Sequence, residues 1–440
     1  MRELGIDADE GLHASFTDVE AWFPQCRFTD CRHQAEPGCA VLAALADGSL
    51  PRERWEHYVA RQHENKHVQD KTSYLIDKRA RNKTNAMWSK QTKKNGGWRM
   101  EDMNIQFETL INALSRQFKK DIISADCQTK PLQGGTVGNV YLVTGIADTA
   151  DGEKWPYRIV LKIQQKWERY GDPGSWRREY DLYASDLGAT FSDAFRWPTC
   201  YHAEINAEEN EFQLWLEYID GVTGLDLTVD MYEQAALELG RYQGKLYAEQ
   251  PAVLQSLTNL SHADLMKNTY LHYRSWPVVY DYIRSENCDF PQHVRQMIID
   301  IDEHADEILD RIEKLPLVLC HRDFWVTNLI YADEKIALID WDTSGWGYLG
   351  EDLASLIADE ADIDHMVENY QRCVPAYYKG FSEYADVPPI TEHCVYELIL
   401  LGFGYRLVEW YLHTEDDDEK TKHFHTLQKI YEMKTTPVLG

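Results

Sequence analysis

One stretch of the chain, residues 317–356, constrains the fold more than any other part of the sequence. It opens with the apolar run Leu317 to Cys320, which predicts a short buried strand and continues directly into His321-Arg322-Asp323. Asn328 follows five residues after Asp323, and a hairpin pattern then delivers Asp340 within the sequence Ile-Asp-Trp-Asp. A strand, a loop and a tight hairpin in this order can bring these three polar side chains to one point.

The three side chains suit the transfer of a phosphoryl group. A carboxylate at Asp323 can accept the proton of an attacking hydroxyl group, as a general base does. The amide oxygen of Asn328 and the carboxylate of Asp340 are hard oxygen ligands of the kind that Mg²⁺ prefers, and the metal neutralises phosphate charge. The alternative is an ordinary surface turn at the end of a strand, and the register of Asn328 and Asp340 argues against it.

The pattern His-x-Asp-x-x-x-x-Asn, followed by Ile-Asp-Trp-Asp and by Glu351 to Ala354, resembles the aminoglycoside phosphotransferase and choline kinase family. The resemblance covers about residues 105–410 and implies an α+β, two-lobed protein-kinase-like fold. It implies a kinase that uses ATP (or GTP) and Mg²⁺ to phosphorylate a hydroxyl group of a small molecule. It also implies that His321 braces the loop and that Asp352 steadies it, whereas Asp342 could serve either the metal or the substrate.

A glycine-rich hairpin precedes this stretch and predicts a phosphate-binding loop. Gly134, Gly135 and Gly138 would let backbone N–H groups approach phosphates closely, although any glycine-rich hairpin has the same pattern. Residues 158–164 alternate as a strand, on which Lys162 suits contact with phosphates; a surface lysine is the alternative.

A helix is expected over residues 176–187, stopped by Gly188. Glu179, in its first turn, is the predicted partner of Lys162, with Asp181 and Asp186 as rivals on other faces.

The apolar strand Phe212 to Ile219 leads to the point where the resemblance places the hinge between the lobes. There Glu217 and Ile219 are expected to contact the adenine base through backbone groups. The resemblance therefore divides this part of the chain into an N-lobe over residues 104–220 and a helical C-lobe over residues 221–440.

A separate cluster near the N-terminus predicts a metal site. Cys26, Cys31, His33 and Cys39 are spaced five, two and six residues apart. Three thiolates and one imidazole form a closed tetrahedral set for structural zinc. A chance cluster of buried thiols is the alternative.

The run from Phe28 to Val41, which includes Cys31, His33 and Cys39, is similar to the C-terminal zinc domain of the small ribosomal subunit biogenesis GTPase. The resemblance covers about residues 1–85 and implies a small, mainly helical zinc-binding module, followed by a polar linker over residues 86–103. The GTP-binding motifs of that family are missing, so GTP hydrolysis is not predicted. The basic tail Asp77 to Lys83 is a candidate for weak contact with ribosomal RNA, and a solvated linker is the alternative.

Charge also divides the chain near residue 100. The chain carries a net charge of −28, yet residues 1–99 hold 16 Lys/Arg against 14 Asp/Glu. The residues Gly96 to Met100 could encode a ribosome-binding site and start codon, so we expect Met100 or Met103 to be an original start preceded by a fused gene remnant. Nine scattered cysteines, an acidic first segment and the lack of a long apolar run predict a cytoplasmic protein with reduced thiols and no membrane contact.

The sequence does not name the acceptor. The acidic balance of residues 100–440 and the aromatic residues of the C-lobe would suit a cationic or amine-bearing alcohol, and an ordinary acidic surface over an aromatic core is an equal alternative. Two other classes remain open: a pseudokinase that only binds ligands, and a ribosome- or RNA-associated zinc protein.

Overall fold

The structure is a computed structural model of the whole chain and forms two compact units, Met1–Gly96 and Gly97–Gly440. It describes residues 19, 21–23, 40–47, 49–52, 54, 55, 107–132, 138–167, 172, 174–206, 210–389 and 393–435. The four predicted zinc ligands, the basic tail, Met100, Gly134 and Gly135 lie outside the described residues.

The described part of the first unit is a helix with a small apolar cluster. Helix α3 spans Ala40–Asp47. The cluster contains the buried residues Val19, Val41, Ala44 and Leu50. The rings of Phe23 and Trp55 pack edge-on against each other beside it, with centroids 6.5 Å apart.

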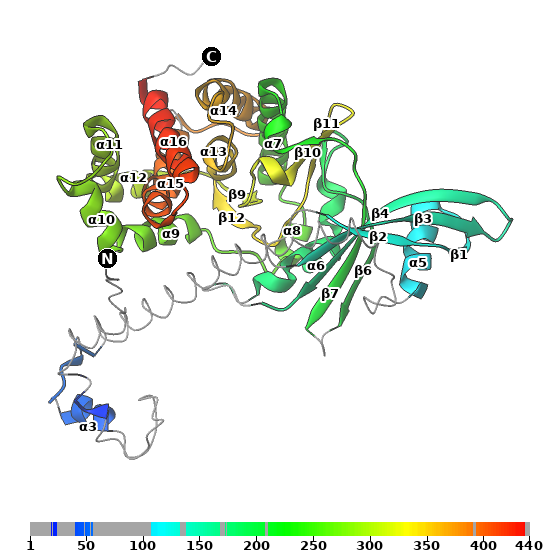
Figure 1. Cartoon of the computed structure of the whole chain (residues 1–440), viewed down its shortest axis with the longest axis horizontal. Helices are drawn as coiled ribbons and strands as arrows, with labels where there is room; N and C mark the ends of the chain where they lie inside the picture. Colours follow the sequence, from blue (N-terminus) through cyan, green and yellow to red (C-terminus); the bar gives the residue numbers. More distant parts are fainter. Residues whose placement is uncertain are drawn as a thin grey trace. The chain divides into compact units, whose positions relative to one another are not determined.

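The second unit begins with helix α5 (Phe107–Phe118) and a twisted antiparallel sheet of six strands, seen on the right of Figure 1. The strands are β1 (Ile122–Ala125), β2 (Gln128–Pro131), β3 (Asn139–Thr149), β4 (Lys154–Gln165), β6 (Cys200–Asn206) and β7 (Glu211–Glu217). Their order is β1-β3-β4-β7-β6, and β2 also pairs with β3. The strands of this sheet all lie within residues 104–220, the range predicted to form the N-lobe.

Successive side chains of β4 point to opposite faces of the sheet, and both faces are buried. Ile159 and Leu161 pack with Leu110 and Leu114 of α5, which covers one face. Lys162 points to the opposite face, where it lies across from Val140 of β3 and Leu214 of β7. The strand therefore directs its lysine toward the C-lobe side of the sheet.

The helix expected over residues 176–187 is shorter in the structure. A 3-10 turn at Ser175–Arg177 leads into α6 (Arg178–Tyr183), and a second 3-10 turn follows at Asp186–Thr190. Ser185 interrupts the helix because its backbone is extended and its hydroxyl accepts a hydrogen bond from the Leu187 amide at 3.2 Å. The prediction that Gly188 ends one continuous helix was wrong.

The C-lobe is built from helices around one large apolar core (Figure 1). They are α7 (Val229–Glu249), α8 (Val253–Ser256), α9 (Leu265–Arg274), α10 (Pro277–Arg284), α11 (Gln292–Glu303), α12 (Ala305–Ile312), α13 (Glu351–Ala358), α14 (Met366–Ser382), α15 (Cys394–His413) and α16 (Asp417–Thr435). Helices α7 and α14 cross closely at glycines. A Cβ atom on Gly240 would lie 2.0 Å from the Tyr377 carbonyl oxygen, and one on Gly380 would lie 2.2 Å from that of Leu237.

Two small sheets lie between the large sheet and the helices. One has the order β5-β11-β10-β8, and the other pairs β12 with β9. Their strands are β5 (Phe195–Arg196), β8 (Val222–Thr223), β9 (Leu317–Cys320), β10 (Leu329–Ala332), β11 (Lys335–Leu338) and β12 (Gly345–Tyr348). The chain thus passes from the large sheet to β5, returns to β6, and leaves again after β7 to reach β8.

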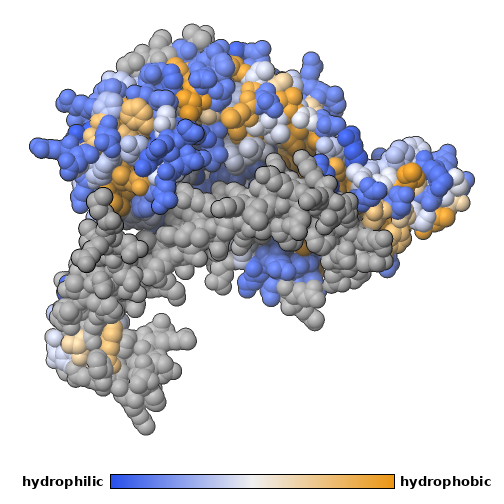
Figure 2. Space-filling view, in the orientation of Figure 1, coloured by the Kyte–Doolittle hydropathy of each residue, from blue (hydrophilic) through white to orange (hydrophobic). Residues whose placement is uncertain are grey.

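The visible surface of the second unit is mainly hydrophilic, with apolar residues in separate patches (Figure 2). Among the described helices, none is long and apolar enough to cross a bilayer.

Candidate active site

The loop predicted to be catalytic follows β9, and the carboxylate of Asp352 binds its backbone. Asp352, at the start of α13, accepts hydrogen bonds from the backbone amides of His321 and Arg322, each at 2.8 Å. Gln243 of α7 donates to the same carboxylate at 3.1 Å. Arg322 has a φ of 65°, which is costly for a residue with a side chain, and these bonds offset that cost.

The β10–β11 hairpin then sets the position of Asp340. Asp333 and Glu334 both have positive φ, as the tight turn of a two-residue hairpin requires. At the end of the hairpin, Asp340 has a φ of 68°, so the chain turns sharply at this carboxylate. The His321 Nε2 atom lies 3.1 Å from the Ile339 carbonyl oxygen, and burial lowers the pKa of His321 to about 4. A neutral imidazole therefore donates to the carbonyl just before Asp340.

Asn328 contacts Asp323 directly. Its Nδ2 atom donates to the Asp323 carbonyl oxygen at 2.9 Å and to the Asp323 Oδ2 atom at 3.1 Å. Because the amide nitrogen is held in this way, the amide oxygen is the atom that can bind a cation. This orientation and the carboxylate of Asp340 fit a hard divalent cation such as Mg²⁺.

Lys162, Glu179 and Asp340 meet in one ion-paired cluster. The Lys162 Nζ atom contacts the Glu179 carboxylate and lies 2.6 Å from the Asp340 Oδ1 atom. Burial alone would lower the pKa of Lys162, but Asp340, Glu179 and Asp342 together raise it above its ordinary value. Burial raises the pKa of Glu179, and Lys162 opposes that effect. The cluster thus joins β4, α6 and the segment after β11.

The rival carboxylates lie elsewhere. Asp181 is bonded to Arg177, with the Arg177 Nη2 atom 2.7 Å from its Oδ1 atom, and Asp186 lies in the second 3-10 turn. Glu179 also accepts a bond from the Trp341 amide at 3.4 Å, one residue after Asp340.

Glu217 and Gly138, two of the predicted nucleotide-binding residues, have contacts that the structure defines. The Glu217 carboxylate is bound by Arg196, with Nη1 to Oε2 at 2.6 Å, and by the Thr199 amide and hydroxyl. Its side chain is therefore engaged in the connection between the lobes. Gly138 lies where a Cβ atom would be 3.0 Å from the Ile163 carbonyl oxygen, so the chain passes close to β4 there.

Some residues around the site were missed by the sequence analysis. The Glu351 side chain is 9% exposed and lies beside Arg322, with the Arg322 Nη1 atom 3.5 Å from its Oε2 atom, and desolvation raises the pKa of Glu351 to about 7. Burial also raises the pKa of Asp352 to about 6. The sequence analysis expected Asp352 to steady the loop but gave Glu351 no role, because a Glu-Asp pair at a helix start is common.

Arg406 of α15 was also missed, since it lies more than eighty residues after Asp323 in the sequence. Its guanidinium group stacks on the Trp410 ring at 4.3 Å and lies 3.7 Å from the Asp359 carboxylate. Burial would lower the pKa of Arg406, but Asp359, Asp323 and Glu360 are among the groups that raise it. Charges of both signs therefore lie on the Asp323 side of the site.

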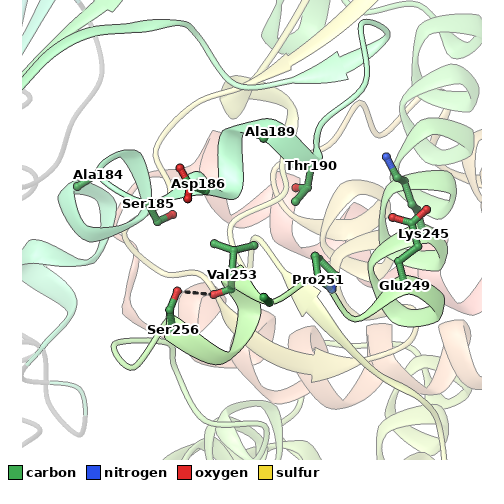
Figure 3. A pocket seen from close by; sticks show the side chains of 11 residues that line it. Ala184, Ser185, Asp186, Ala189, Thr190, Lys245, Glu249, Pro251, Val253 and Ser256 are labelled. Carbon is green, nitrogen blue, oxygen red and sulfur yellow. Dashed lines mark hydrogen bonds between the residues drawn. The ribbon is translucent and has the colours of Figure 1, made fainter.

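A hollow of about 630 Å³ lies apart from this cluster, between the second 3-10 turn and the end of α7 (Figure 3). Lys245 and Glu249 of α7 line one side, and Ser185 and Asp186 line the other. None of the predicted catalytic residues lines this hollow.

Comparison with known proteins now identifies the family. Residues 138–381, more than half of the chain, match the profile of the phosphotransferase enzyme family. The chain belongs to the phosphotransferase enzyme family. It is a kinase, as the resemblance of its catalytic loop predicted.

The N-terminal fragment matches a different group of proteins. It is similar to the small ribosomal subunit biogenesis GTPase RsgA of Streptomyces avermitilis, with 47% identity over 73 residues, which is 16% of this chain and 20% of that protein. The protein of the same name from Xylella fastidiosa is 53% identical over 58 residues, covering 13% of this chain and 18% of the relative. The chain therefore spans about a fifth of the length of these curated relatives.

Solved structures that show some similarity to this chain include a choline kinase from Cryptosporidium parvum, with 17% identity and a TM-score of 0.44 over 70% of this chain and 90% of that one. They also include the GDP complex of aminoglycoside 2'-phosphotransferase-IIIa, with 13% identity and a TM-score of 0.46 over 75% of this chain and the whole of that one. The assignment of this phosphotransferase to its family rests on the profile match alone.

Proposed function

We propose that residues 97–440 transfer the γ-phosphoryl group of ATP (or GTP) to the hydroxyl group of a small-molecule alcohol. The observation that carries this proposal is the convergence of Lys162, Glu179 and Asp340 in one cluster, with Asn328 bonded to Asp323 beside it. Three chain segments far apart in the sequence supply the groups that phosphoryl transfer needs.

Each residue has a distinct part in the proposed reaction. Asp323 orients the acceptor hydroxyl and receives its proton, while Asn328 holds the Asp323 side chain in place. Lys162, fixed by Glu179, binds the phosphates, and Asp340 with the amide oxygen of Asn328 would hold Mg²⁺. When bound, Mg²⁺ neutralises charge on the phosphate oxygens.

The nucleotide is proposed to lie between the glycine-rich loop and the hinge. Gly134, Gly135 and Gly138 would offer backbone N–H groups to its phosphates. Glu217 and Ile219 would contact the base through their backbones, since the Glu217 side chain is bound by Arg196 and Thr199.

The acceptor has to be found by an unbiased search. Arg406, Asp359 and Glu360 place both positive and negative charge on the Asp323 side of the site, so the search should cover cationic, anionic and neutral alcohols. An acceptor with an ammonium group would agree with the acidic composition of residues 100–440, and an anionic acceptor would contradict that argument.

The proposal is tested by two substitutions with different expected effects. Asp323→Ala should lower phosphoryl transfer by roughly 10²–10⁴-fold, the range for a positioned base, with little change in nucleotide affinity. Asp340→Ala should weaken Mg²⁺–nucleotide binding as well as turnover, because it removes a metal ligand. Asp306→Ala, which changes an exposed aspartate of α12, is the matched control. Wild-type turnover in both Asp323→Ala and Asp340→Ala would refute this site.

For the N-terminal unit we propose a structural zinc ion held by Cys26, Cys31, His33 and Cys39. The similarity of this segment to RsgA proteins supports the proposal. The donor set supports it independently, since three thiolates and one imidazole are typical of closed zinc sites. Weak contact with ribosomal RNA through the basic tail is proposed on the same similarity. Binding of isolated ribosomal subunits to the full chain and to a Cys31→Ser variant would test that contact.

A further inference from the structure

Arg178, the first residue of α6, is buried in the contact between the two lobes. Its side chain is 1% exposed. Its Nε atom donates to the Asn259 carbonyl oxygen at 2.5 Å, and its Nη1 atom donates to the Asp342 carbonyl oxygen at 2.7 Å. Its Nη2 atom contacts the two carboxylate oxygens of Asp172 at 2.6 and 2.8 Å.

These acceptors belong to three separate segments of the chain. Asp172 precedes α6, Asn259 lies in the loop after α8, and Asp342 follows the proposed metal ligand Asp340 by two residues. A planar guanidinium group with fixed donor directions can hold three such segments in one arrangement, which a flexible ammonium group cannot. Arg178 therefore sets the distance between α6 and the segment that carries Asp340.

The neighbouring residue strengthens this link. Glu179 accepts from the Trp341 amide, while Arg178 donates to the Asp342 carbonyl oxygen. The side chains of Arg178 and Glu179 thus bind the backbone of the two residues that follow Asp340. Because Glu179 also contacts Lys162, any displacement of α6 moves Lys162 and Asp340 relative to each other.

The loop that contains Asn259 is itself tightly fitted. The Asn259 Nδ2 atom donates to the Gly174 carbonyl oxygen and to the Asp181 Oδ2 atom, each at 2.9 Å. A Cβ atom on Gly174 would lie 2.3 Å from the Asn259 Oδ1 atom. The loop leaves α8, where the Ser256 hydroxyl donates to the Val253 carbonyl oxygen at 2.7 Å (Figure 3).

The same loop also contacts the segment after Asp342. The Ser261 amide donates to the Ser344 carbonyl oxygen at 3.0 Å, and a Cβ atom on Gly345 would lie 1.9 Å from the Ser261 hydroxyl oxygen. The loop with Asn259 and Ser261 therefore packs between α6 and β12, the strand that follows the proposed metal ligand Asp340.

We infer that Arg178 is a positioning residue for phosphoryl transfer: it fixes α6 to the backbone after Asp340, so that Lys162 and Asp340 keep one geometry. This inference rests on the function proposed above. Small displacements of groups that align phosphates are costly, since an error of about 1 Å can reduce turnover on the order of 10²-fold.

The test compares Arg178→Lys with Arg177→Gln. Lysine keeps the positive charge at position 178, but its donors share one nitrogen atom and lack the planar fork that spans Asn259, Asp342 and Asp172. Arg177 is the matched control because it is the adjacent arginine and pairs with Asp181 at the surface. The measurements are Mg²⁺-dependent nucleotide hydrolysis, which needs no acceptor, and nucleotide binding at several Mg²⁺ concentrations.

Arg178→Lys should lower kcat at least about 10-fold and raise the Mg²⁺ concentration for half-maximal rate, with the KM for nucleotide within about 3-fold of wild type. Arg177→Gln should stay within about 2-fold of wild type on all three quantities.

A chemical rescue separates positioning from folding. Arg178 lines a hollow of about 530 Å³ with Asn259, so a small cation can reach its place. Guanidinium at non-denaturing concentration should restore part of the turnover of Arg178→Ala, and ethylammonium should restore less. A merely structural role would lower the folded fraction without changing the Mg²⁺ dependence of the folded protein.

Wild-type kcat and Mg²⁺ dependence in Arg178→Lys would overturn the inference, provided that Asp340→Ala loses both. If Asp323→Ala and Asp340→Ala both keep wild-type hydrolysis, the proposed function itself is refuted. The two failures can therefore be told apart.

Discussion

Replacing Lys162 by methionine should reveal how much stability its buried ion pair contributes. The Lys162 and Glu179 side chains are only 8% and 2% exposed, so solvent screens their interaction weakly. Removing one partner of a buried pair leaves the other charge without compensation and costs about 3–5 kcal/mol of unfolding free energy. We expect Lys162→Met to lose this amount near neutral pH, as measured by urea denaturation.

The loss should shrink as the pH falls. Burial raises the pKa of Glu179, and without Lys162 nothing in the pair opposes that rise. Because the folded variant then binds a proton that the unfolded chain releases, its stability relative to wild type increases as the pH falls toward the ordinary pKa of a glutamate. A pH-independent loss would contradict this mechanism.

A second variant separates stability from catalysis. Lys162→Met combined with Glu179→Leu replaces both charges by apolar groups and should recover most of the stability, because such exchanges are often neutral. Turnover should stay lost, since no cation remains for the phosphates. The control is Lys154→Met on the same strand, whose lysine is 72% exposed in a surface pair and should matter by less than about 1 kcal/mol. Full stability in Lys162→Met alone would refute the reasoning.

Three further predictions concern other parts of the chain. Elemental analysis should find one zinc ion per chain, and Cys31→Ser should reduce the zinc content, with unchanged zinc arguing against the proposed ligands. Gly240→Ala should destabilise the C-lobe by about 1–3 kcal/mol or more in thermal or urea unfolding, because the added Cβ atom meets the Tyr377 carbonyl oxygen. Burial raises the pKa of Glu351 to about 7, so wild-type stability should fall as the pH rises from the ordinary glutamate value through about 7. Glu351→Gln should remove at most about 3 kcal/mol of this pH dependence, and identical pH profiles would contradict the assigned burial.

The sequence was most informative for those parts of the proposed site that are close together in the chain. Asp323, Asn328 and Asp340 lie within eighteen residues, and a loop followed by a hairpin brings them together by local geometry. Helical spacing alone did not decide whether Glu179, Asp181 or Asp186 would pair with Lys162, and the structure pairs Lys162 with Glu179.

Arg178 could not be found in this way. Its partners lie 6, 81 and 164 residues away, and two of its acceptors are backbone carbonyl groups, which have no signature in the sequence. The break after α6 was missed for a related reason: a serine that caps the next turn competes with continuation of the helix, and propensity alone does not decide between them.

The two chain passages around β5 and after β7 have a consequence for motion. Arg196 and Thr199, on the first passage, both bind the carboxylate of Glu217 at the end of β7. Because these bonds join the return from β5 to the end of β7, the connections between the two sheets resist twisting more than a single unbraced strand would. We therefore expect relative motion of the lobes to be mainly bending near Glu217, with little twisting. Closure limited in this way should cost little conformational entropy, because the bonds to Glu217 would already exclude many relative orientations of the lobes.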